Sequence, residues 1–354
     1  MTRFATGLVV GKFYPPHAGH HHLIATAARA CAELTVVAAP SRQESIPLDL
    51  RVEWLRALHP GVRVVGVHDD HPIDYGSADA WDTHVAVFRD AAGRDRFDAV
   101  FSSEAYGPEL ARRFHAVHVP VDPQRATVPV SGTAIRADPV AHWRHLSGPV
   151  RAWFTRRVIA VGAESTGTTT IASALAAHYR ARGGVWADTR WVPEFGRELT
   201  ARKMRARPDL PVADLTWDRD DFVEVVTEQN RAEDEAAALG SPILFGDTDA
   251  AATAIWERRY LGSTSPAVLA AARPPDLYLL TDHEGVPFED DGMRDGEHLR
   301  AWMTGLFRAH LATLGVPVLE LRGPHDTRMS LAVAACDALL DKGWSLAEPK
   351  KPRS

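Results

Sequence analysis

The sequence predicts an α/β protein of two consecutive domains, each built on a parallel sheet covered by helices. Short apolar runs alternate with helical stretches along the chain, which is the pattern of strands buried on both faces. Two of these runs lead through a glycine-containing turn into a helix, one near the start of the chain and one near its middle. A length of 354 residues also suits two domains of ordinary size.

The first half contains alternating predicted strands and helices. The predicted strands are the apolar runs Gly7–Val10, Leu34–Ala39, Val62–Val67, Ala99–Phe101 and Val117–Val121. The predicted helices between them are His20–Ala32, Asp49–Leu58, Ala78–Ala91 and Pro108–Phe114. This order is typical of a Rossmann-like sheet.

A second series of elements begins at the apolar run Arg157–Val161, which leads through a glycine-rich turn into a long helix over residues 169–181. Later strands are predicted at Pro242–Phe245, Leu277–Thr281 and Val316–Leu321. We therefore place the two domains at residues 1–148 and 149–345. Residues 346–354 are polar and contain proline, so we expect a disordered tail there.

Composition narrows the class of protein. The apolar fraction of 45% and the charged fraction of 24% are those of a globular protein, and the net charge of -6 argues against nucleic acid as the main partner. No apolar run approaches the roughly 20 residues that a membrane span needs, and the N-terminus lacks a signal-peptide pattern. Cys31 and Cys336 fit no metal or redox spacing. We expect a cytoplasmic protein that contacts neither membrane nor nucleic acid; its oligomeric state, a homo-oligomer included, stays open.

The first motif, GKFYPPHAGHHHLI, covers residues 11–24 and joins a predicted strand to a predicted helix. His17 and His20 are three residues apart, so both can lie on one side of the start of the helix. The free N–H groups and the dipole at that position favour phosphate, and Gly19 leaves room for a nucleotide. A second motif, VSGTAIR, adds the hydroxyls of Ser131 and Thr133 and, one turn later, the guanidinium of Arg136.

These residues suit adenylyl transfer, in which a phosphate attacks the α-phosphorus of ATP and negative charge builds on the equatorial oxygens. Positioning and charge stabilisation then carry most of the rate, and two imidazole donors with a bound Mg²⁺ can supply both. The H-x-G-H pattern with a distant S-x-T-x-x-R resembles the nucleotidyltransferase superfamily. The longer forms GKFYPPHAGH and SGTAIRADPVAHW resemble the NMN adenylyltransferase domain of NadR-type enzymes.

This resemblance implies that His17 and His20 bind ATP phosphates and stabilise the transition state. It implies that Ser131, Thr133 and Arg136 hold the triphosphate. We assign four further residues of the first motif to nucleotide binding: Gly11, Lys12, Phe13 and Gly19.

Recognition of nicotinamide requires a surface for a flat cationic ring, which favours aromatic stacking. Tyr75 and Trp81 lie in a predicted loop-to-helix region, DYGSADAW, and are our candidates for substrate contact. The alternative for Trp81 is an ordinary buried tryptophan. Trp54 competes for the same role, but its helical spacing with Leu50 and Leu58 indicates a core residue.

The glycine-rich turn after the predicted strand Arg157–Val161 has the spacing of the P-loop G-x-x-x-x-G-K-[ST]. Thr168 stands where the lysine is expected. We assign eight residues to nucleotide binding: Gly162, Glu164, Ser165, Thr166, Gly167, Thr168, Thr169 and Thr170. Thr169 is the expected Mg²⁺ ligand. The missing lysine leaves three interpretations open: a kinase-like domain that is inactive, a substitute cation (Arg197, Arg202, Lys203 or Arg294), or a phosphate held by backbone and Mg²⁺ alone.

Three further segments resemble ribosylnicotinamide kinase domains. PEFGRE supplies Glu194 and Arg197, and DDGMRD supplies Arg294, all expected at the substrate. ILFGDTD is an apolar strand that ends in two acids, so Asp247 or Asp249 could act in catalysis and Asp247 could hold Mg²⁺.

The resemblance thus implies a fused enzyme of NAD biosynthesis that uses ATP, NMN and nicotinamide riboside. One alternative is an active adenylyltransferase whose P-loop domain only senses nucleotide. Some NadR-type proteins also carry an N-terminal DNA-binding segment; no helix-turn-helix precedes the first strand here, and we expect none. Other adenylyltransferases share the H-x-G-H chemistry, but the kinase fused to FAD synthetases has no P-loop. The sequence leaves open whether the kinase is active and whether nicotinate mononucleotide is also accepted.

Overall fold

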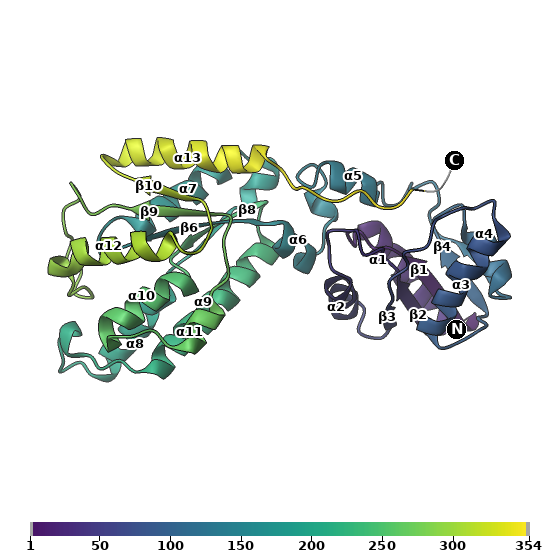
Figure 1. Cartoon of the computed structure of the whole chain (residues 1–354), viewed down its shortest axis with the longest axis horizontal. Coiled ribbons are helices and arrows are strands. Elements are labelled where there is room, and N and C mark those ends of the chain that lie inside the picture. Colours follow the sequence, from purple (N-terminus) through teal and green to yellow (C-terminus); the bar gives the residue numbers. More distant parts are fainter. Residues whose placement is uncertain (1–2, 352–354) are drawn as a thin grey trace. The chain divides into compact units, whose positions relative to one another are not determined.

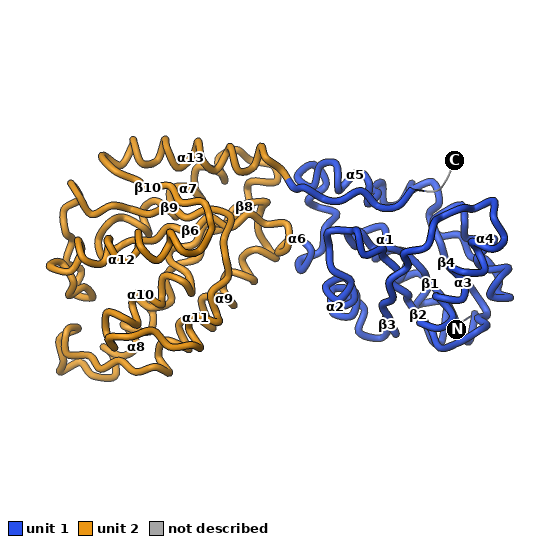
Figure 2. Tube along the Cα trace, viewed as in Figure 1, with its two compact units in different colours: residues 1–150, 344–354 blue, residues 151–343 orange. Residues whose placement is uncertain are grey.

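The computed structural model describes residues 3–351, which form two compact units (Figure 2). Unit 1 runs to Val150 and also takes the chain from Trp344 onward, whereas unit 2 comprises Arg151–Gly343. The division after Val150 lies close to the predicted boundary at residue 148. Within residues 3–351, no helix is both long and apolar enough to cross a membrane.

Unit 1 contains a five-stranded parallel sheet in the order β3-β2-β1-β4-β5 (Figure 1). Its strands are β1 (Phe4–Gly11), β2 (Cys31–Ala38), β3 (Arg63–Gly66), β4 (Ala99–Ser102) and β5 (Val117–Pro120). Its helices are α1 (Ala18–Ala30), α2 (Leu48–Leu58), α3 (Ala78–Ala92), α4 (Gly107–Arg113), α5 (Gly132–Ala137) and the 3-10 helix η1 (Trp143–His145), with α6 (Gly148–Phe154) crossing the unit boundary. The strand order reverses between β1 and β4, which is where ligands bind in such sheets.

Strand β1 shows why the apolar runs are continuous rather than alternating. Val9 packs with α1 and α2 on one face of the sheet. Leu8 and Val10 pack with α3 and α4 on the other face. Because successive side chains point to opposite faces and both faces are covered, every residue at the centre of the strand is apolar.

Unit 2 contains a second parallel sheet, in the order β10-β9-β6-β8-β7. Its strands are β6 (Arg156–Gly162), β7 (Arg190–Val192), β8 (Ile243–Asp247), β9 (Leu277–Thr281) and β10 (Val318–Leu321). Its α-helices are α7 (Thr168–Arg180), α8 (Phe195–Ala206), α9 (Arg219–Leu239), α10 (Ala250–Leu261), α11 (Pro266–Ala271), α12 (Arg300–Leu311) and α13 (His325–Asp341). Its 3-10 helices are η2 (Gly184–Asp188), η3 (Val212–Asp214) and η4 (Glu297–Leu299).

The two faces of this sheet are covered by different helices. Helices α7 and α13 pack on one face, against Val158 and Ala160, and α10 and α12 pack on the other, against Ile159 and Val161 (Figure 1). Two parallel α/β sheets confirm the predicted fold class. The sequence did not predict β7, because an edge strand of three residues is too short to show a pattern.

The C-terminal segment corrects the expectation of a disordered tail over residues 346–354. Up to Lys351 it lies against unit 1, whereas residues 352–354 fall outside the described part. The Tyr14 hydroxyl donates to the Ala347 carbonyl at 2.9 Å, the Ala347 N–H donates to Ser45 Oγ at 2.7 Å, and Gln43 Nε2 donates to the Glu348 carbonyl at 2.9 Å. These bonds use the main chain of the tail, so a polar composition does not prevent its ordering.

Candidate active sites

His17, His20 and Arg136 line one cavity of about 370 Å³ in unit 1. The cavity lies at the carboxyl ends of β1 and β4, where the strand order reverses. Residues from two motifs that are distant in the sequence therefore line one cavity, as adenylyl transfer by these residues would require. Their roles in binding and catalysis remain proposals.

His17 is the N-cap of α1, and its Nδ1 accepts the N–H of Gly19 at 3.1 Å. A neutral imidazole that accepts at Nδ1 carries its proton on Nε2, so that N–H is available as a donor. Only 5% of the residue is exposed. Burial, followed by the charges of His21 and Arg125, lowers the pKa of His17 to about 3.

The ring of His20 lies 3.8 Å from the ring of His17, centroid to centroid, and meets Phe13 edge-on at 5.0 Å. Burial and then the charge of His17 lower its pKa well below the ordinary value. Its Nδ1 is shielded from solvent and has no hydrogen-bond partner within residues 3–351. Both imidazoles are therefore neutral at physiological pH.

Helix α5 brings the second motif to the same cavity. Ser131 caps the helix through its side chain, which accepts the Ala134 N–H at 3.1 Å. Arg136 donates to the Tyr14 carbonyl at 2.7 Å and to Thr133 Oγ1 at 3.3 Å, and its guanidinium lies 5.0 Å from the centre of the Tyr14 ring. The guanidinium is thus held in place before any ligand is bound.

The other residues assigned in the first motif also line this cavity: Gly11, Lys12, Phe13 and Gly19. Phe13 is buried in the core beneath α1, so only part of its ring borders the space. Lys12 Nζ lies 3.4 Å from Glu44 Oε1 and donates to the Lys350 carbonyl at 3.2 Å. Sequence reasoning missed Arg125, which lines the cavity and pairs with Glu104 at 3.0 Å. It lies in a loop without a recognisable pattern.

A smaller cavity of about 120 Å³ adjoins α3 and contains both aromatic candidates. Tyr75 is 52% exposed, and its ring lies 6.3 Å from that of Tyr106 in a nearly parallel arrangement. Trp81 is 8% exposed and donates through Nε1 to the Tyr75 carbonyl at 3.2 Å. It packs in the core with residues of α3 and α4 and also lines the cavity. Trp54 is buried on α2 and does not line this cavity.

An ionised acid forms one wall of the smaller cavity. Asp69 accepts hydrogen bonds from His84 Nδ1 at 2.5 Å and from His71 Nδ1 at 3.0 Å. Burial alone would raise the pKa of Asp69, but these bonds outweigh it and the pKa is lowered. The same bond to Asp69 raises the pKa of His84. The wall therefore carries negative charge next to the aromatic rings.

In unit 2 the P-loop joins β6 to α7. Gly167 has φ +90°, and a Cβ on Gly162 would lie 2.4 Å from Thr281 Oγ1, so both positions require glycine. The carbonyl of Ser165 accepts from Arg300 at 3.0 Å, and that of Thr166 accepts from Arg328 at 3.0 Å. Because N–H and C=O point to opposite sides of a trans peptide, the adjacent N–H groups face the cavity, as in an anion-binding nest.

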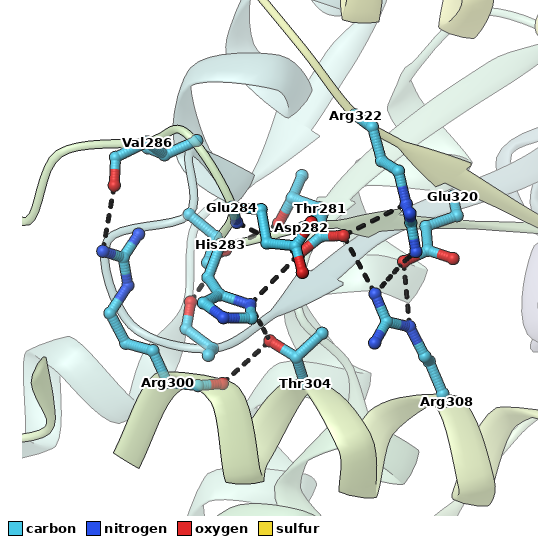
Figure 3. A network of polar contacts seen from close by, with 12 residues as sticks. Thr281, Asp282, His283, Glu284, Val286, Arg300, Thr304, Arg308, Glu320 and Arg322 are labelled. Carbon is cyan, nitrogen blue, oxygen red and sulfur yellow. Dashed lines mark hydrogen bonds and ion pairs between the residues drawn. The ribbon is translucent and has the colours of Figure 1, made fainter. Parts of the chain in front are cut away.

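A buried carboxylate, Asp282, forms ion pairs with two arginines (Figure 3). Asp282, directly after β9, receives Arg308 at 2.9 Å and Arg322 at 3.1 Å. Its backbone carbonyl accepts from Arg328, the residue that also holds Thr166. Burial tends to raise the pKa of Asp282, but the N–H of Glu284 and the two guanidinium groups lower it overall. The contacts of Arg308 and Arg322 lie outside the P-loop cavity, whereas Arg328 also lines it.

The P-loop borders a cavity of about 370 Å³, lined by Ser165 to Thr170 and by Arg294, His325 and Arg328. Thr169 Oγ1 donates to Asp247, which lies at the end of β8 and is 2% exposed. Burial raises the pKa of Asp247, against the effect of this hydrogen bond, so the carboxylate lacks a full counter-charge. A hydroxyl and a carboxylate turned to one point fit a Mg²⁺ that takes its other ligands from phosphate and water.

A second cavity of unit 2, about 100 Å³, contains the three predicted substrate residues. Burial and then the charge of Asp247 raise the pKa of Glu194 to about 8. Arg197 pairs with Asp291 at 2.5 Å. Arg294 lies 3.3 Å from Ser165 Oγ and borders both cavities of the unit.

One strand assignment needs correction, and two P-loop side chains are engaged within the protein. Asp249 lines neither cavity, since one oxygen caps α10 and the other accepts from the Tyr278 hydroxyl at 2.6 Å. The Glu164 carboxylate is taken by Arg259 at 2.6 Å and by the Gly296 N–H at 2.7 Å. The Thr166 hydroxyl is buried and bonds within the protein, so only its backbone can face phosphate. Asp249 therefore acts from outside both cavities, whereas Glu164 lines the substrate cavity and Thr166 lines the P-loop cavity.

The depressed pKa of His17 predicts a pH dependence of folding. Its pKa is about 3 in the fold and about 6.5 in an unfolded chain, so the unfolded chain binds the extra proton between these values. Stability is therefore complete above pH 6.5 and falls on acidification, by about 1.4 kcal/mol per pH unit for this group. Denaturant unfolding of unit 1 between pH 6 and 4 should show a flatter slope for His17→Asn than for wild type.

The matched control is His115→Asn, because His115 is an exposed histidine of the same unit whose φ of +53° asparagine tolerates well. Its curve should run parallel to that of wild type. Groups facing His17 from other elements, His145 and Arg136, stay unchanged in both variants. Equal slopes for all three proteins would contradict a depressed pKa at His17.

Comparisons with known proteins agree with both halves of this description. A family described as an AAA domain matches residues 157–328. The trifunctional NAD biosynthesis/regulator proteins NadR of Escherichia coli and Salmonella typhimurium are each 26% identical over 309 residues, covering 81% of this chain and 71% of theirs.

Two solved structures of NadR proteins share the fold. One, in complex with NR, has a TM-score of 0.71 at 22% identity and covers 97% of this chain and 98% of its own. The other, in complex with NAD and AMP-PNP, has a TM-score of 0.71 at 21% identity and covers 96% and 97%. The chain is therefore similar to NadR proteins in sequence and shares the fold of their solved structures, and its second half matches a family described as an AAA domain.

Proposed function

We propose that unit 1 transfers the adenylyl group of ATP to nicotinamide mononucleotide, giving NAD and pyrophosphate. The observation that carries this proposal is the shared wall of its two cavities, one lined by imidazoles and a guanidinium and the other by aromatic rings. Seven residues line both: Val10, Gly11, Lys12, Ile73, Tyr75, Tyr106 and Lys350. One molecule with a phosphate at one end and a flat ring at the other can occupy both spaces.

In the proposed reaction an oxygen of the mononucleotide phosphate attacks the α-phosphorus of ATP. The bond from that phosphorus to the bridging oxygen breaks, and pyrophosphate leaves with its Mg²⁺. The Nε2–H of His17, together with His20, donates to the oxygens that gain charge, and Arg136 binds the leaving phosphates through two N–H groups. Neutral donors suit this task because they need not lose a proton as charge moves.

The smaller cavity suits the other end of the substrate. The nicotinamide ring of the mononucleotide is cationic, and aromatic faces such as that of Tyr75 attract cations. The ionised Asp69 in the same wall adds to this attraction. The relatives' bound ligands, NR in one structure and NAD with AMP-PNP in another, belong to the same chemical class.

The test is direct. Pure protein with ATP, Mg²⁺ and nicotinamide mononucleotide should form NAD and pyrophosphate in equal amounts, followed by a coupled dehydrogenase and by pyrophosphate release. Pyrophosphate without NAD would mean ATP hydrolysis and would contradict the proposal, as would NAD formation that persists when Arg136 is replaced by glutamine.

A second activity, phosphorylation of nicotinamide riboside by unit 2, is favoured by a specific observation. The P-loop cavity and the substrate cavity meet at Ser165, Thr168, Thr169 and Arg294. Within residues 3–351, Arg294 is the charged member of this junction. It supplies the positive charge that Thr168 does not.

The other candidate cations are each paired with an acid. Arg197 pairs with Asp291 and lines the substrate cavity but not the P-loop cavity. Arg202 pairs with Glu224 at 2.6 Å, and Lys203 pairs with Asp221 at 2.7 Å and lies over the Trp217 ring. Neither borders the P-loop cavity. In this proposal Thr169 and Asp247 would hold Mg²⁺, which would neutralise phosphate charge, and Arg294 binds the transferred phosphoryl group.

The alternative is a P-loop unit that binds nucleotide without transferring phosphate. Incubation with ATP, Mg²⁺ and nicotinamide riboside distinguishes the two. Formation of the mononucleotide supports the kinase, whereas ATP binding without any mononucleotide supports a sensor.

A further inference from the structure

The C-terminal segment contributes a charged side chain to the cavities of unit 1. Pro349 and Lys350 line the larger cavity beside His17 and Arg136, and Lys350 also lines the smaller, aromatic cavity. The segment reaches this position from the far end of the sequence, more than 300 residues after the first motif. The tail is therefore part of the walls of both spaces.

The tail is seated on the loops that carry the first motif. The Tyr14 hydroxyl donates to the Ala347 carbonyl at 2.9 Å. The hydroxyl oxygen of Tyr14 also accepts the Ser45 N–H at 3.0 Å. The carbonyl of Tyr14 in turn accepts from Arg136 at 2.7 Å. Lys12 donates to the Lys350 carbonyl at 3.2 Å. A continuous set of hydrogen bonds thus connects the tail to the guanidinium of the second motif.

The charges at the junction of the two cavities are distinctive. Of the seven shared residues, the two lysines, Lys12 and Lys350, are the ionic members, as judged over the described residues 3–351. The chain has only five lysines against 35 arginines, and two of the five line the junction of these cavities. Their ammonium groups come from segments at opposite ends of the sequence.

In the proposed reaction the mononucleotide phosphate lies at this junction. The ring occupies the aromatic cavity, and the phosphate must reach the α-phosphorus of an ATP held by the imidazoles and Arg136. A phosphate monoester carries up to two negative charges, which a pair of ammonium groups can balance. The Lys350 Nζ now donates to the Asp70 carbonyl and lies 4.0 Å from Asp70 Oδ1, a carboxylate already paired with Arg42. It is 28% exposed and can turn to a better anion.

We infer that Lys350 binds the phosphate of the nucleotide acceptor, so that the C-terminal segment completes the acceptor site of unit 1. This inference rests on the proposed adenylyl transfer and adds to it a residue outside both motifs. The positive charge acts on the acceptor before and during attack, whereas ATP is held by other groups. Loss of Lys350 should therefore weaken the acceptor and leave ATP unaffected.

The experiment compares Lys350→Gln, Lys350→Arg and Lys351→Gln in the full chain. Lys351 is the matched control, because it is the neighbouring lysine, is 78% exposed and pairs with Glu348 at 3.7 Å. Lys350→Gln should raise KM for nicotinamide mononucleotide by about tenfold to a hundredfold, as expected for one charge-assisted hydrogen bond. KM for ATP should change by less than about twofold, and Lys350→Arg should keep most of the affinity.

The outcomes distinguish a failure of the proposed adenylyl transfer from a failure of the role given to Lys350. Wild-type protein that makes no NAD overturns the proposed function and this inference with it. Wild-type protein that makes NAD, with an unchanged KM in Lys350→Gln or an equal rise in Lys351→Gln, overturns only the role of Lys350. A lower KM or faster turnover in Lys350→Gln also overturns it, since the tail would then obstruct the cavity. Equal melting temperatures of all variants exclude unfolding as the cause of a raised KM.

Discussion

Replacing His17 by asparagine is expected to lower kcat for NAD formation by about a hundredfold to a thousandfold, the usual effect of removing one donor to developing charge. Asparagine is as good an N-cap as any residue, so α1 should still begin in the same place. What is lost is the imidazole and its Nε2–H. The hydrogen bond that this N–H donates strengthens as charge builds on the α-phosphate. We therefore expect kcat to fall much more than KM for ATP rises.

His22→Asn is the control for this prediction. His22 lies on the same helix and does not line either cavity of unit 1. Steady-state kinetics on both variants, with melting curves alongside, should show near wild-type turnover for His22→Asn. A His17→Asn enzyme with unchanged kcat would mean that the imidazole only caps the helix.

Replacing Arg294 by glutamine is expected to lower the rate of nicotinamide riboside phosphorylation by about a thousandfold, the lower end of the range for an arginine that binds a transferred phosphoryl group. The reason is that the junction of the two unit 2 cavities loses its cation while Thr168 offers none. NAD formation from the mononucleotide uses unit 1 and should be unchanged. Both rates are measurable on one preparation.

Two further variants sharpen this test. Arg258→Gln removes an exposed arginine of α10 that borders neither cavity of the P-loop, and should keep the kinase rate. Thr168→Lys, added to Arg294→Gln, should restore part of the lost rate, because a lysine at 168 reaches the same phosphates. A kinase rate that survives Arg294→Gln would show that backbone and Mg²⁺ suffice, and an absent rate in wild type would favour a nucleotide sensor.

Much of the fold and part of the site follow from local patterns in the sequence. Buried strands such as β1 and β6 are continuous apolar runs, and β6 leads into a turn in which Gly162 and Gly167 have identifiable tasks. The convergence of His17, His20 and Arg136 could be predicted because all follow strands of one parallel sheet, whose carboxyl ends share an edge. Spacing and strand order were enough for that step.

The remaining features depend on contacts that leave no local pattern. Asp249 follows the same strand as Asp247, yet its carboxylate caps α10 and binds the Tyr278 hydroxyl. Which of the two neighbouring acids meets the hydroxyl of Thr169 is decided by the turn between them, where Thr248 has φ +68°. The tail is a similar case, because the bonds to Ala347 and Glu348 go to main-chain atoms that every sequence possesses.

The return of the chain to unit 1 has a consequence for biosynthesis. Translation proceeds at about 5–20 residues per second, and N-terminal domains fold while the rest is still being made. The sheet of unit 1 can assemble early, but its last wall waits until the roughly 200 residues after Val150 have emerged, on the order of 10–40 s later. The half that is translated first is thus the half that matures last, and a ribosome stalled within unit 2 would carry a nascent first half with an unfinished acceptor site.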